Sequence, residues 1–317
     1  MRTLMLIFGP FVMVAAAYAV SMQNGTRIAI PPAAVEDRLP GGAGKAAESE
    51  KKLLTPLHAA CDRSARELRS QLGTSCSVIS QPPFVVAGDV SAARLQQCYV
   101  QTILPVARVL EKSYFATRPN QPIQVVLFAS EQSYREYATR VDGPNAAGYY
   151  GYFQRSDRRI VANRATGDGT LAHELTHALS QFDFPNMPEW FDEGLASLHE
   201  ESEFSPDGTR LIGLHNWRLR LLQAALRRDK LPSLEEVLAS TEFRGEGEGL
   251  HYAMVRYLCL FLQDQELLVP FYRQFRADIV RDPTGTETLC SITSVGRLDE
   301  LDTRFRAWLG EVTEARP

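Results

Sequence analysis

Apolar residues recur with a helical period along much of the chain. Leu53–Leu72 and Ala92–Phe115 both place apolar residues three and four positions apart, which predicts an amphipathic helix in each segment. Beyond residue 170 the pattern predicts helices almost throughout, and Ser233 followed by Glu236 predicts a capping box at the start of one of them. The clearest later helices are Leu250–Leu262, Leu267–Ile279 and Leu298–Leu309.

Short β-branched runs predict strands in the first half of the chain. Phe84–Ala87 and Pro122–Phe128 are two such runs, and Ser130 after the second can cap a helix over Glu131–Thr139. Two further runs, Tyr149–Phe153 and Arg159–Ala162, flank a polar turn and predict a hairpin. The order of elements predicts an α+β fold, with a small mixed sheet edged by a hairpin and a mainly helical C-terminal half.

The first 19 residues have the features of a signal peptide. Arg2 precedes the apolar stretch Leu4–Ala17, and Ala17-Tyr18-Ala19 resembles a cleavage site. Cleavage would make the protein periplasmic or secreted. The alternative is an uncleaved membrane anchor, although the apolar stretch is short for a span and Gly9-Pro10 interrupts it.

The rest of the chain divides into four predicted parts. Residues 20–51 are rich in proline and glycine and predict a flexible linker. Residues 52–82 form a helical extension, residues 83–182 an α/β part, and residues 183–317 a helical part. We expect the last two parts to share one cleft.

Charge and cysteine content narrow the choice of partners and compartment. The chain of 317 residues has 34 Lys and Arg against 38 Asp and Glu, a net charge of −4, which argues against nucleic-acid binding. It has five cysteines, some of which we expect to pair in an oxidising compartment. Cys259, in an apolar run, is the best candidate for a buried free thiol. The other four, which allow three connectivities, are Cys61, Cys76, Cys98 and Cys290.

A pair of histidines carries the most specific chemistry. His173 and His177 lie four residues apart in a segment with helical apolar spacing, so both imidazoles leave one face and can converge on one metal ion. Glu174 stands beside them, where it could take a proton from metal-bound water. Neutral imidazoles suit zinc.

A catalytic zinc ion needs a third protein ligand and an open position. Pro188 fits the first turn of a new helix, and Glu193 in its second turn can face the histidines. Asp192 is an alternative ligand, but it lies about 100° round the helix from Glu193. We therefore predict Glu193 as the ligand and Asp192 as the residue that orients a histidine. The third histidine and the glycine of a metzincin are missing, since Asp183 and Ser180 occupy those positions.

These motifs resemble those of the gluzincin zinc metallopeptidases, in particular the peptidase MA-like group. The resemblance rests on His-Glu-Leu-Thr-His at 173–177 and on Pro-Glu-Trp-Phe-Asp-Glu-Gly-Leu-Ala at 188–196, and its elements extend over roughly residues 83–312. It implies one Zn²⁺ per chain, bound by His173, His177 and Glu193, with Glu174 as general base. It also implies a tyrosine that stabilises the oxyanion, and Tyr252 matches that position, although the adjacent His251 could serve instead.

The sequence thus predicts a zinc-dependent peptidase acting on a peptide or protein substrate. The Gly-x-Met-Glu-Asn element of aminopeptidase gluzincins is absent, which favours an endopeptidase-like cleft. The strand at 147–153, with Tyr149, Tyr150 and Tyr152, could pair with an extended substrate if it edges the cleft. Two alternatives stay open: a catalytically inactive, zinc-stabilised binding or scaffold protein, and a zinc hydrolase of other acyl groups.

Overall fold

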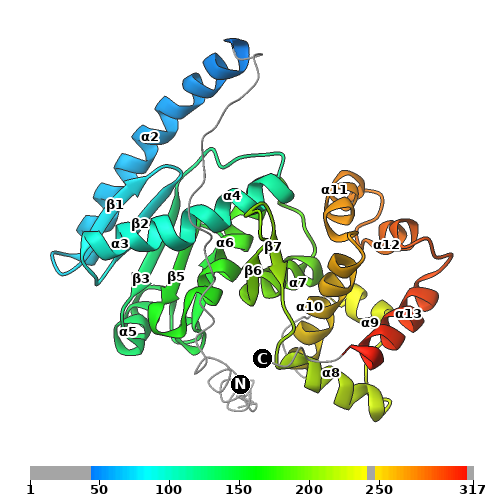
Figure 1. Ribbon diagram of the computed structural model, residues 1–317. Coiled ribbons are helices and arrows are strands. Elements are labelled where there is room, and N and C mark those ends of the chain that lie inside the picture. The colour runs from blue at the N-terminus through cyan, green and yellow to red at the C-terminus, as the bar shows by residue number, and fades with distance from the viewer. Residues whose placement is uncertain (1–43, 241–246, 313–317) are drawn as a thin grey trace, which may run out of the picture.

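A mixed β-sheet and a group of C-terminal helices lie side by side in the protein (Figure 1). The computed structural model describes residues 44–240 and 247–312. The predicted signal segment 1–19 and residues 20–43 of the predicted linker lie outside the described residues. None of the helices in the described part is both long and apolar enough to cross a membrane.

The sheet has five strands in the order β1-β2-β3-β5-β4. The three inner strands are parallel, and each outer strand pairs with its neighbour antiparallel. The inner strands are apolar because both faces of the sheet are covered. The strands span β1 Ser77–Gln81, β2 Phe84–Gly88, β3 Ile123–Phe128, β4 Gly151–Gln154 and β5 Arg159–Asn163.

Side chains alternate between the two faces of the sheet, and each face has its own core. Val85 and Ala87 pack under α2 (Gly44–Leu72) and α5 (Glu131–Asp142), whereas Phe84 and Val86 belong to the larger core on the other face. That larger core is covered by α3 (Ala92–Cys98), a π-helical turn (Tyr99–Ile103), α4 (Leu104–Ser113) and α6 (Asp168–Asp183).

Helix α7 connects the sheet part to the C-terminal helices, because it packs against both α6 and α10. Trp190 and Phe191 of α7 stack against Phe271 and Phe275 of α11, which fixes α7 in the apolar interior. The elements of this half are α7 Glu189–Glu200, β6 Ser202–Phe204, β7 Leu211–Gly213, α8 Arg218–Arg227, α9 Leu234–Ala239, α10 Glu248–Asp264, α11 Leu268–Asp278, α12 Thr286–Ile292 and α13 Leu298–Glu311.

The prediction of an α+β fold with a mainly helical C-terminal half is confirmed, and three local predictions are wrong. The segment predicted as one helix over 92–115 is α3, a π-helical turn and α4 in succession. Residues 44–51, predicted as linker, belong to α2, and the predicted helical extension 52–82 ends in the strand β1. The hairpin β6–β7 interrupts the half predicted as helical. Its strands have three residues each, too few for a period of two to stand out.

All five cysteines are free thiols, so the expected pairing is wrong, whereas Cys259 is the buried free thiol that was predicted. The reason lies in their positions. Cys61 of α2 packs in the core on one face of the sheet, and Cys98 of α3 packs in the core on the opposite face. Cys290 lies farther along, in α12.

Candidate metal centre

Helix α6 presents two histidines from one face, as the sequence predicts. His173 and His177 are one turn apart, and their Nε2 atoms lie 3.1 Å from each other. The side chain of His177 is 9% exposed and that of His173 is 16% exposed, so both sit in a largely dry recess. Their neighbours on α6, Leu171, Ala172 and Leu175, are buried in the main core and hold the helix against the sheet.

Helix α7 folds back on α6 and brings Glu193 to the histidines. Pro188 is the N-cap residue of α7, one position before the predicted first turn. Glu193 Oε2 lies 3.6 Å from the Nε2 atom of each histidine. The next residue, Gly194, permits the close approach of α10, because a Cβ atom there would lie 2.9 Å from the Val255 carbonyl oxygen.

The donor set fits a zinc ion. Two ligand atoms at the usual distance from a tetrahedral zinc ion lie about 3.3 Å apart, and the three separations here are 3.1, 3.6 and 3.6 Å. One oxygen and two imidazole nitrogens are ligands that zinc accepts, and three protein ligands leave a fourth position for water or substrate. His173, His177 and Glu193 are the group in the described part of the chain whose ligand atoms converge in this way.

Asp192 lies against one of the histidines, where the sequence predicts a residue that orients a ligand. Its Oδ2 atom is 2.9 Å from His177 Nδ1, in a close contact without the angle of a regular hydrogen bond, and the Nε2 atom of that ring faces His173 and Glu193. Ser180 donates a hydrogen bond of 3.3 Å to the other oxygen of Asp192. Arg155, in the turn after β4, donates to Asp192 Oδ2 and thereby connects the β4–β5 hairpin to the candidate metal ligands.

Burial and opposite charges shift the ionisation of the cluster. Burial raises the pKa of Glu174, the two histidines lower it, and the carboxylates of Glu193 and Asp192 raise it, with a net increase. Burial lowers the pKa of His177, but Asp192 and Glu193 outweigh this and hold it well above its usual value. The cluster therefore favours a positive charge among its carboxylates, which a proton or a metal ion can supply.

A third histidine, which the sequence analysis did not select, supports α6 from behind. His199 of α7 is fully buried, with Nδ1 3.3 Å from Thr176 Oγ1 and Nε2 3.4 Å from the Tyr114 hydroxyl. Thr176 donates to the Ala172 carbonyl, so its oxygen accepts from Nδ1 and the Tyr114 hydroxyl donates to Nε2. Burial and the charge of Arg256 lower the pKa of His199 to about 3, so the ring is neutral.

Tyr252 and His251 lie in the first turn of α10 and are half-buried. Tyr252 shares a helical stripe with Val255 and Cys259, and these two are the residues that approach Gly194 of α7. This stripe therefore faces the helix that carries Glu193. The placement leaves both candidates for the oxyanion role open.

The hairpin predicted at the sheet edge is present, but β4 begins at Gly151, so Tyr149 and Tyr150 precede the strand and only Tyr152 lies in it. β4 is the last strand of the sheet order. The Tyr152 hydroxyl donates to Asp142 of α5, so this residue faces away from α6. Gly151 faces α6 instead, where a Cβ atom would lie 2.6 Å from Thr170 Cγ2. Tyr152 is thus a packing residue.

Comparison of the chain with known protein families and with curated proteins finds no match.

Proposed function

We propose that the protein is a zinc-dependent peptidase with an endopeptidase-like cleft. The observation that carries the proposal is the convergence of His173, His177 and Glu193 at distances of 3.1–3.6 Å beside a buried Glu174. A structural zinc site usually has four protein ligands, whereas three ligands with a nearby carboxylate suit hydrolysis.

Glu174 is the proposed general base. Zinc, when bound, supplies Lewis acidity that polarises the scissile carbonyl group and lowers the pKa of water. The Glu174 carboxylate takes the proton of the attacking water and passes it to the nitrogen of the leaving amine. Burial raises the pKa of Glu174 towards neutral pH. A carboxyl group with such a pKa is suited both to accept the proton of water and to donate it to the amine.

Two further elements complete the proposal. The Tyr252 hydroxyl, or His251 in its place, would donate a hydrogen bond to the developing oxyanion. The strand β4 is at the edge of the sheet and packs beside α6, so its outer backbone groups could pair with an extended peptide. This arrangement would lay the substrate along β4 in front of the metal ligands.

The test compares the purified protein with its Glu174→Gln variant. We expect about one zinc ion per chain in both, and cleavage of a fluorogenic peptide library by the wild type alone. Glu203→Gln is the matched control, since Glu203 is an exposed residue of β6, and should cleave like the wild type. Zinc in both proteins without cleavage would support the inactive scaffold, and absence of zinc from both would overturn the proposal.

A further inference from the structure

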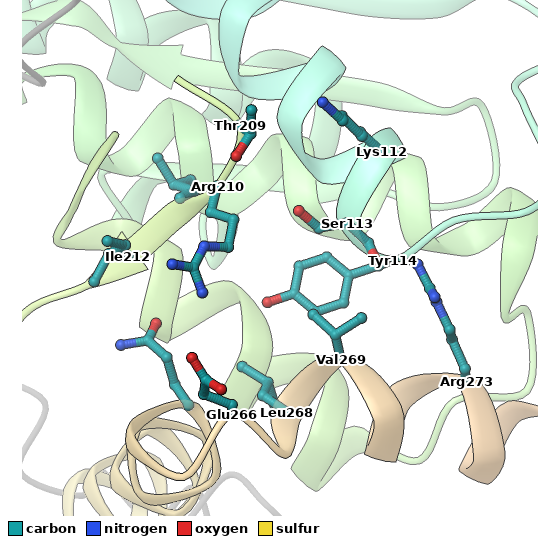
Figure 2. Close-up of a pocket in the computed structure, with 12 residues that line it drawn as sticks. Lys112, Ser113, Tyr114, Thr209, Arg210, Ile212, Glu266, Leu268, Val269 and Arg273 are labelled. Carbon is teal, nitrogen blue, oxygen red and sulfur yellow. Dashed lines mark hydrogen bonds between the residues drawn. The ribbon is translucent and has the colours of Figure 1, made fainter. Parts of the chain in front are cut away.

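A second concave site lies away from the metal ligands. It is a cavity of about 470 Å³ between the end of α4, the strand β7 with its preceding turn, and the corner between α10 and α11 (Figure 2). None of the proposed zinc ligands lines it. Its volume is in the range of pockets that hold small molecules.

The walls of the cavity are positively charged in an acidic protein. Lys112, Arg210 and Arg273 line it, against one carboxylate, Glu266, while the whole chain has a net charge of −4. The Arg273 guanidinium donates a 2.8 Å hydrogen bond to the Ser113 carbonyl and is thereby held at the wall. The Arg210 side chain is exposed, points into the cavity in Figure 2, and makes no hydrogen bond or ion pair within the described residues. The free cation therefore favours an anionic ligand.

The remaining lining is apolar. The half-buried side chains of Ile212 and Val269 offer apolar surface to the cavity (Figure 2), whereas the lining residues Tyr114, Leu211 and Leu268 are almost completely buried. The corner that carries Glu266 is held in place, because Gln263 makes two hydrogen bonds of 2.8 and 3.1 Å with the backbone of Gly213 in β7. Apolar side chains next to an unpaired guanidinium suit a ligand with an apolar body and one carboxylate.

We propose that this cavity binds a small organic carboxylate with an apolar body. The carboxylate pairs with Arg210 at the cavity wall, and the apolar body covers Ile212 and Val269. Glu266, which also points towards the cavity in Figure 2, disfavours a multiply charged anion. The proposal is independent of peptidase activity.

The test measures ligand binding to the full protein by calorimetry and by thermal shift. The probe is N-acetyl-L-leucine, and the matched control ligand is N-acetyl-L-leucinamide, which has the same body without the charge. We expect the acid to bind and to raise Tm, the amide to bind at least about tenfold more weakly, and Arg210→Gln to weaken binding of the acid about tenfold. Arg135→Gln, an exposed cation on α5, should bind the acid like the wild type.

Any of three other outcomes overturns the proposal. If the acid does not bind, the cavity is not a binding site for such a carboxylate. Equal affinity of wild type and Arg210→Gln places the acid elsewhere, for example on the zinc ion. Binding of inorganic phosphate as tight as that of the acid shows a general anion patch that makes no use of the apolar side chains.

Discussion

Asp192 connects the candidate zinc ligand His177 to Arg155 and Ser180. Its side chain is 4% exposed and accepts from Arg155 and Ser180 in addition to its contact with His177 Nδ1. We predict that Asp192→Asn weakens zinc binding while the fold stays intact, because Asn keeps the volume and one acceptor oxygen but loses the negative charge.

The size of the effect follows from this contact. The carboxylate fixes the orientation of the His177 ring and increases its basicity, and removal of such a partner typically lowers metal affinity about 10- to 100-fold, or roughly 1.4–2.7 kcal/mol. Loss of the ion pair with Arg155 should lower the free energy of unfolding only slightly. The side chain of Arg155 is already 51% exposed, so water can hydrate the released guanidinium.

The assay is a zinc competition titration against a chelator, with circular dichroism to check folding. Asp157→Asn is the control, since Asp157 also pairs with an arginine, Arg159, at 2.9 Å in the same hairpin but does not contact His177. Zinc affinity of a folded Asp192→Asn variant within twofold of the wild type would refute the role given to this carboxylate.

Three further predictions concern the residues around the centre. Tyr252→Phe should lower kcat about 100-fold with zinc binding unchanged, as measured by steady-state kinetics and metal content; an unchanged kcat would exclude the hydroxyl and leave His251. Gly194→Ala should lower the free energy of unfolding by about 1 kcal/mol in urea titrations, since the contact of its Cβ atom with Val255 outweighs the gain in helix propensity; equal or greater stability would contradict this. His199 should make the protein less stable in acid, because between pH 6.5 and about 3 the unfolded chain binds a proton there that the folded chain does not. The free energy of unfolding should fall by about 1.4 kcal/mol per pH unit from this group, and His199→Gln should flatten that slope in urea titrations at several pH values.

The sequence predicts the convergence of the two histidines and Glu193 because the information for it is local. His173, His177 and Glu193 are related by helical spacing and one short turn, so their convergence follows from regular geometry. Arg155 and His199 were missed because their roles depend on packing: Arg155 reaches Asp192 from the β4–β5 turn, and His199 meets Tyr114 across the core.

The difference between local sequence information and long-range packing also explains the errors in the predicted fold. The apolar positions Leu95, Ile103 and Leu110 are buried as predicted, although the helix around them changes to π-geometry at Tyr99–Ile103. Periodicity reports which side is buried, but it does not resolve such a local change of pitch. The cysteine prediction relied on composition, which contains no distances, and the structure places Cys61 and Cys98 on opposite faces of the sheet.

The two-helix origin of the ligand set has a consequence for the order of folding. His173 and Glu193 are only 20 positions apart along the chain, so closing the loop between them costs little entropy. Tyr252, one of the two candidates for the oxyanion role, comes 59 positions after Glu193, on α10, which packs against α7. We therefore expect the α6–α7 pair, with the three candidate ligands, to form earlier in folding than the contact of α10 with α7, so that a partly folded chain would already hold the proposed zinc ion before either oxyanion candidate is in place.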